Sequence, residues 1–155
     1  MRDLSPEEKA VRDRRKAEFD DFLAERMPVL ASFAEALELE NPPMIVADPQ
    51  LYVPKVDEFL EMQDIQENDR EWIILRLGFL IGEVLVQRLG GCWLLNDNPD
   101  SRTFLRYVVG QFAGARTSAM VDPFEVADVL TSQKAPRHFS AMIEEVVAEV
   151  VRALA

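Results

Sequence analysis

Most of the chain shows apolar residues at helical spacing, and the first predicted helix begins near the N-terminus. Ser5, Pro6 and Glu8 together predict a helix start, as the cap, a first-turn proline and the second half of a capping box. The early turns of this helix are charged almost all round, and an apolar stripe appears only from Phe19 onward. We therefore expect residues 1–18 to form a projecting, charged helical arm.

The middle of the chain predicts a helix that is buried on several sides. Pro28 should kink the first helix or begin a new one, and residues 41–54 hold too many prolines for a regular element. A short helix should follow from Lys55 to Gln66. The next one, from Asp69 to Leu89 with Asn68 and Asp69 as its cap, is apolar on nearly every face. It should end at Gly90-Gly91, with one glycine left-handed.

Two glycines in this central helix, Gly78 and Gly82, lie four residues apart and therefore on one face. Each costs about 1 kcal/mol of helix propensity relative to alanine. We expect another backbone to approach closely at that face.

Beyond the central helix, the apolar period changes from 3.6 to 2. Cys92–Leu95 and Thr103–Val109 read as strands around a turn, and Thr117–Val121 is a candidate third strand. A helix capped by Asp122 and a last helix from near Pro136 complete the chain. We predict one α+β domain over residues 1–155, mainly helical with about six helices. Its small antiparallel sheet of two or three strands should lie between the central helix and the last two helices.

Composition excludes several classes of function. The chain has 28 acidic and 17 basic residues and a net charge of -11, which repels nucleic acid unless a strong basic patch is present. The N-terminal basic residues are interleaved with acidic ones, so they favour a solvated helix instead. Cys92 and His138 are the only residues of their types. A disulfide within the chain, a thiolate metal site and a zinc site with several histidines are therefore excluded, and we expect no metal and no cofactor.

No membrane role is expected either. The N-terminus has no apolar core of the kind found in secretory signals. The most apolar stretch, Trp72 to Leu89, carries Arg76, Glu83 and Arg88, which are costly near a bilayer centre. We expect a cytoplasmic protein.

One motif of the chain reads Leu77-Gly78-x-x-x-Gly82-Glu83-Val84-Leu85 followed by Leu89-Gly90-Gly91-x-Trp93, with the later helix start Val121-Asp122-Pro123-Phe124. In these residues the chain resembles a group of uncharacterised bacterial domains of unknown function. The resemblance covers roughly residues 70 to 130. It implies a fold grouping and a bacterial source, and no activity.

Glu83 is the sharpest candidate for a functional side chain, because it lies within the most apolar helix. Buried carboxylates can act as acids or bases, and Arg76 lies two turns away on the same face. With Trp93 and Tyr107, these residues would form a ligand pocket at the end of the central helix. The structural alternatives are a carboxylate paired with an arginine or with backbone N–H groups, and a tryptophan that anchors the core.

Three other features favour structural readings. Cys92 has apolar neighbours and predicts a buried, inert thiol. His138 reads as an exposed residue near a helix start. The run Asn96-Asp97-Asn98-x-Asp100 resembles a calcium loop but lacks its glycine and its last glutamate, so a hairpin turn is expected.

The leading functional hypothesis is a non-enzymatic protein-interaction module, of adaptor or immunity-like type, that binds a protein partner of basic character. No complete catalytic set is present, so no catalytic residue is assigned. The expected interaction surface comprises the arm and the acidic face of the last helix, represented by Arg12, Arg15, Glu144, Glu145 and Glu149. The alternatives are a small-molecule binder or weak hydrolase with a pocket near Glu83, and a structural homodimer through the N-terminal helix.

Overall fold

The structure is a computed structural model and describes residues 2–112 and 119–154. Within these residues the chain forms six α-helices, a 3-10 helix and a two-stranded sheet, which confirms a mainly helical α+β fold. In order the elements are α1 (Pro6–Ala36), α2 (Met44–Ala47), η1 (Pro49–Tyr52), α3 (Val53–Glu61), α4 (Glu67–Leu89), β1 (Cys92–Leu95), β2 (Tyr107–Gly110), α5 (Pro123–Ser132) and α6 (Phe139–Leu154).

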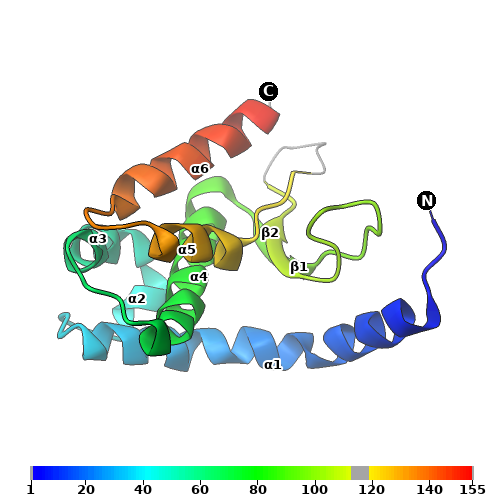
Figure 1. The fold of residues 1–155 in the computed structure, drawn as a ribbon, viewed down its shortest axis with the longest axis horizontal. Helices are drawn as coiled ribbons and strands as arrows, with labels where there is room; N and C mark the ends of the chain where they lie inside the picture. The colour runs from blue at the N-terminus through cyan, green and yellow to red at the C-terminus, as the bar shows by residue number, and fades with distance from the viewer. Residues whose placement is uncertain (1, 113–118, 155) are drawn as a thin grey trace.

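The central helix α4 organises the core, as its sequence predicts. An unbroken run from Leu77 to Leu85 is buried. Figure 1 shows α1 and α6 on opposite sides of α4, with α2 and α3 at one end of the molecule and the sheet at the other. Every other element can therefore bury its apolar face against α4 or against a neighbour of α4.

The predicted helix starts are confirmed at both strong capping signals. Ser5 Oγ accepts from the N–H of Glu8 at 3.1 Å, and Glu8 Oε1 accepts from the N–H of Ser5 at 3.0 Å. Asp122 caps α5 by accepting from two backbone N–H groups of its first turn. At the other end of α4, Gly90 is left-handed with φ 67°, as expected of a helix-ending glycine.

Prolines bear on the boundary predictions in two places. Of the two alternatives predicted at Pro28, a kink or a new helix, no new helix begins there, because α1 continues through Pro28 to Ala36. Because Pro28 lies on the exposed side, water can satisfy the carbonyl that loses its partner. The predicted loop over 41–54 is wrong, since α2 and η1 occupy most of it. Pro49 opens η1 and Pro54 lies in the first turn of α3, where a missing N–H costs no hydrogen bond.

The cap of α4 also differs from its prediction. The helix begins at Glu67, with Gln66 as the capping residue, and Asn68 and Asp69 already lie in its first turn. An acidic side chain in the first turn interacts favourably with the positive end of the helix dipole, so Asp69 suits the first turn as well as a cap position.

Within the described residues the antiparallel sheet has two strands, within the prediction of two or three, but its second strand is shorter than predicted. Cys92 pairs with Gly110 and Leu95 with Tyr107, in antiparallel register. The predicted second strand began at Thr103, but residues 103–106 form turns and Leu105 has a positive φ of 64°. Of the candidate third strand, residues 117 and 118 lie outside the described part, and Val121 makes a single bridge to Val109.

The glycines of α4 admit aromatic rings, not the second backbone that the sequence suggested. A Cβ atom on Gly78 would lie 2.1 Å from Cδ1 of Phe124. One on Gly82 would lie 2.0 Å from Cζ2 of Trp93. The two rings approach the backbone of the helix closely because the glycines have no side chains to stand between them.

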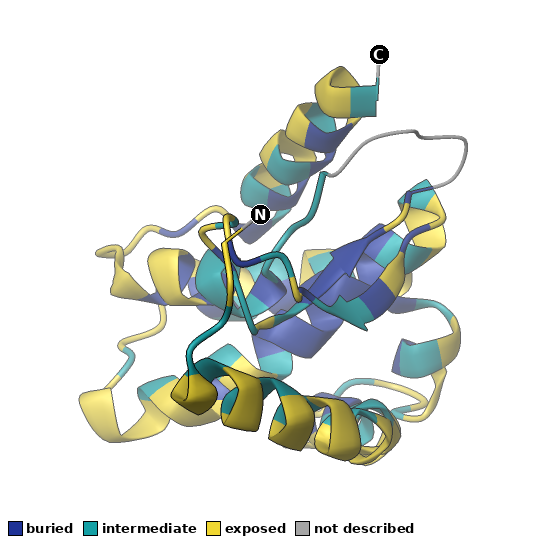
Figure 2. Cartoon of the chain, turned by 90° about the vertical axis from the view of Figure 1, so that its right-hand side faces the viewer, coloured by how far each residue is buried: buried dark blue, intermediate teal, exposed yellow. Residues whose placement is uncertain are grey.

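The N-terminal arm is solvated but touches its own chain. No residue from Pro6 to Glu18 is fully buried, and α1 presents a largely exposed face in Figure 2. The Arg2 guanidinium lies 5.5 Å from the ring centre of Phe104. Further along, the Tyr107 hydroxyl donates to the carbonyl of Arg15 at 2.6 Å. These contacts hold the arm against the segment between β1 and β2 and against the first residue of β2.

Candidate functional site

Glu83 is buried, but the arginine that it binds is not the predicted one. Its Oε1 atom accepts from Nη1 of Arg26 at 2.5 Å and from Nε1 of Trp93 at 3.1 Å. Arg76 instead lies over the ring of Trp72 at 3.9 Å and donates to its carbonyl at 3.1 Å. The sequence missed Arg26 because the pair depends on where α1 crosses α4.

The geometry of Glu83 is that of a structural carboxylate. Its side chain is only 8% exposed, and its partners tie together α1, α4 and β1. Trp93 lies within an aromatic cluster, with ring centres of Phe22, Phe79 and Phe124 between 5.3 and 5.9 Å away. The indole therefore anchors the core.

Tyr107 and Arg76 lie apart from this network. Tyr107 is half-buried against Phe22, with ring centres 4.3 Å apart, and burial raises the pKa of its hydroxyl. It borders a shallow hollow of about 380 Å³ with Arg15, Leu75 and Phe124. Burial lowers the pKa of Arg76, whose Nε atom has no partner within the described residues. The four predicted ligand-binding residues therefore do not converge on one cavity.

The predicted interaction residues belong to two separate surfaces. On the arm, Arg12 pairs with Asp13 at 3.2 Å and Arg15 lies over the ring of Tyr107. On α6, Glu144 forms a two-pronged ion pair with Arg88, at 2.6 and 2.8 Å, which lowers the pKa of this glutamate. The remaining two, Glu145 and Glu149, border a hollow of about 360 Å³ beside α5. Since α1 and α6 flank α4 on opposite sides, the five residues form no single patch (Figure 1).

Cys92 and His138 are both exposed. The prediction for His138 is confirmed, and the prediction of a buried thiol is wrong. Cys92 is the first residue of β1. Its exposed thiol donates to the amide oxygen of Gln111 at 3.4 Å. The turn predicted after β1 is confirmed, with Asn98 and Asp100 donating their N–H groups to Asn96 and Asn98 side chains.

The strongest charge feature of the molecule lies elsewhere, in residues 35–71. This segment holds eleven acidic residues and two basic ones, Lys55 and Arg70, which gives it -9 of the chain's net charge of -11. One of the two cations is already neutralised, because Arg70 is ion-paired with Asp128. Sequence reasoning overlooked the segment because it weighed charge over the whole chain; a count in successive windows would have found it.

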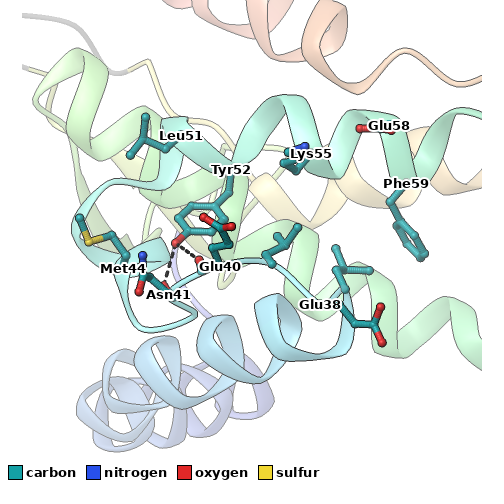
Figure 3. A pocket seen from close by; sticks show the side chains of 11 residues that line it. Glu38, Glu40, Asn41, Met44, Leu51, Tyr52, Lys55, Glu58 and Phe59 are labelled. Atoms are coloured by element: carbon teal, nitrogen blue, oxygen red, sulfur yellow. Dashed lines mark hydrogen bonds between the residues drawn. The ribbon is translucent and has the colours of Figure 1, made fainter.

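Two adjoining hollows run through this acidic segment. The larger, of about 700 Å³, lies between the end of α1 and α3 and is bordered by Glu38, Glu40, Glu58 and Lys55. Figure 3 shows Met44 and Leu51 toward one end of it and Glu38 and Phe59 toward the other. Met44 is 48% exposed and Leu51 61% exposed, so the hollow combines acidic and apolar surface.

The smaller hollow, of about 440 Å³, shares Leu37 and Phe59 with the first. It adds Ile65, Asp64 and Asp69 and ends against Trp72, which is 39% exposed. We call the two hollows together the acidic groove, lined by Ala36–Asn41, Met44, Leu51, Tyr52, Lys55, Glu58, Phe59, Gln63–Ile65, Asn68, Asp69, Trp72 and Ile73.

The rim of the groove contains a strained residue. The N–H of Leu39 donates to the carbonyl of Ala34, and that of Glu38 to the carbonyl of Glu35, both at 2.9 Å. This is a Schellman motif with Glu38 in the left-handed position, at φ 57°, where glycine is usual. The Glu38 side chain is exposed and forms no ion pair within the described residues. Non-glycine residues retained in strained positions are frequent at functional sites.

Two further observations limit the chemistry of the described residues. They contain no group of three or more potential metal ligands placed to share an ion. None of the helices within residues 2–112 and 119–154 has the length and apolar character needed to cross a membrane.

Comparison with known proteins adds no assignment. No family model, no curated protein and no solved structure matches this chain. The resemblance noted for residues 70 to 130 therefore rests on its motif alone.

Proposed function

We propose that this protein is a non-enzymatic protein-interaction module, of adaptor or immunity-like type, acting in the bacterial cytoplasm. Its partner is a basic protein, and the acidic groove is the surface that binds it. The observation that supports this proposal is the concentration of net charge and exposed apolar side chains on the same segment, residues 35–71.

The rim carboxylates are available for a partner. Glu38, Glu40 and Glu58 are exposed and form no ion pair within the described part of the chain. Like charges held close together repel one another, and a cationic partner relieves that repulsion on binding. The same field attracts basic proteins over a distance and raises their association rate.

The rival hypothesis of a small-molecule binder or weak hydrolase at Glu83 has less support. The carboxylate is held by Arg26 and Trp93 and is nearly inaccessible, so a substrate would have to displace a buried ion pair. In the homodimer hypothesis, the arm would pair with a second copy in addition to the contacts that it makes with Phe104 and Tyr107 of its own chain.

The test is an affinity purification of the tagged chain from its native cells, with matched variants. The groove variant carries Glu38→Gln, Glu40→Gln and Glu58→Gln. The control variant carries Asp20→Asn, Asp21→Asn and Glu25→Gln, which are exposed on α1 beyond the arm, and changes the net charge equally. We expect a stoichiometric basic protein on the wild type and the control, and its loss from the groove variant. A partner that the groove variant retains would refute the assignment of the surface.

The residues singled out from the sequence lie on two separate surfaces, the arm and α6, and both belong in the same experiment. A third variant substitutes Arg12 and Arg15 on the arm, and a fourth substitutes Glu144, Glu145 and Glu149 on α6. Loss of the partner from one of these variants, with retention by the groove variant, would move the interface to the arm or to α6.

A further inference from the structure

We infer that the partner binds the acidic groove through an amphipathic segment that places a large apolar side chain against Trp72 and cations along Glu38, Glu40 and Glu58. This inference rests on the proposed function and specifies the partner that fits the groove. It assigns different chemistry to the two hollows, an apolar anchor to the smaller and cation binding to the larger.

The Trp72 end of the groove favours an apolar group over a cation. The Arg76 guanidinium lies 3.9 Å from the ring centre and already occupies one face of the indole. Phe33 contacts the same ring edge to face, with ring centres 5.8 Å apart. A second cation near this ring would be repelled by Arg76. The surface that remains around the indole is formed by Leu37, Phe59, Ile65 and Ile73, and Asp64 and Asp69 line the other part of this hollow.

The opposite end favours cations. Glu38, Glu40 and Glu58 border the larger hollow, and among the described residues Lys55 is the only basic one that lines it. Exposed carboxylates of this kind are worth little singly but act together on a ligand with several charges. Leu37 and Phe59 line both hollows, so one continuous segment can reach the anchor and the carboxylates together.

Charge also decides among the classes of occupant. A second copy of this chain would set one surface of net charge -9 against another wherever the grooves met face to face. Nucleic acid and anionic lipid surfaces carry the same sign as the groove and are repelled. A basic segment with apolar residues at helical spacing satisfies both hollows, which is the helix-in-groove mode of peptide recognition.

The experiment uses the full chain and two synthetic peptides, measured by titration calorimetry. The first peptide is lysine-rich and carries phenylalanine at helical spacing, and the second has serine in place of phenylalanine. The variants are Trp72→Ala, the triple groove variant, and Leu75→Ala as a control. Leu75 is 37% exposed, close to the 39% of Trp72, and lies on the same helix outside the groove. Thermal unfolding of each variant verifies that it is folded.

We expect the phenylalanine peptide to bind at least about tenfold more tightly than its serine twin, the scale of one interface anchor. Trp72→Ala should remove that difference and Leu75→Ala should preserve it. Equal binding of both peptides, with loss of both in the groove variant, would overturn the anchor and leave the proposed function standing. Absence of binding by either peptide would overturn the inference and count against the proposed function as well.

Discussion

Replacing Glu38 by glycine should stabilise the protein while weakening the surface that we assign to its partner. Glu38 holds the left-handed position of a Schellman motif with φ 57°, and its side chain is exposed. A left-handed conformation costs a non-glycine residue about 1–2 kcal/mol. Glycine avoids this strain but loses about 0.5–1 kcal/mol through its more flexible unfolded state. The net gain should be about 0.5–1 kcal/mol.

The assay is thermal unfolding followed by circular dichroism. For a chain of this size, 1 kcal/mol shifts Tm by about 2–4 °C, so the variant should melt about 1–4 °C higher than the wild type. Removing a carboxylate from a strongly acidic segment also reduces repulsion, and Glu38→Gln measures that contribution alone. The difference in Tm between Glu38→Gly and Glu38→Gln isolates the backbone effect.

Glu35→Gly provides the opposite control. Glu35 is exposed, carries the same charge and lies three residues earlier, in the last turn of α1, where the backbone is still α-helical. There, glycine should lower stability by up to about 1 kcal/mol. If Glu38→Gly melts no higher than Glu38→Gln, the left-handed position carries no strain, and the argument that function retains Glu38 fails.

Three further predictions concern the core and the capped N-terminus. Gly82→Ala should lower the free energy of unfolding by about 1–3 kcal/mol, more than Gly78→Ala, because the new methyl meets the ring of Trp93, which a hydrogen bond to Glu83 holds in place. Equal losses of stability for the two variants in urea unfolding would contradict this. Glu83→Ala should cost about 3 kcal/mol, since it leaves a guanidinium and an indole N–H without their acceptor, and an unchanged unfolding midpoint would show that water replaces the carboxylate. Hydrogen bonds from Arg2 and the backbone lower the pKa of Glu8 from 4.5 to about 2. The stability that ionised Glu8 gives to the arm is therefore complete above pH 4.5 and is lost as the pH falls through 2. NMR titration should give a Glu8 midpoint near pH 2, with fraying of the arm over the same range that is absent in Glu8→Gln; a midpoint near 4.5 would contradict it.

The correct and incorrect sequence predictions differ in the range of the interactions behind them. The capping box at Ser5, the Asp122 cap and the left-handed Gly90 are made by groups within four residues of each other. Their geometry is therefore written in a short stretch of sequence. The partner of Glu83 is Arg26, 57 residues away, and its identity depends on how two helices cross.

The same contrast explains the glycines of α4. Sequence showed that Gly78 and Gly82 share a face and that something must approach it closely. Only the packed molecule shows that Phe124 and Trp93 fill the space, because these rings arrive from α5 and β1.

The sequence by itself determined the α+β class, the buried central helix, the local caps and the acidic balance of the chain. These follow from periodicity, from hydrogen bonds between near neighbours and from composition. The tertiary structure decided where the charge acts. Leu37, Phe59 and Trp72 come from three different helices or their ends, and only packing brings them together in one groove with the exposed carboxylates of Glu38, Glu40 and Glu58. A surface of this kind is a property of the arrangement of helices and not of any one of them, since each supplies only part of its floor and rim.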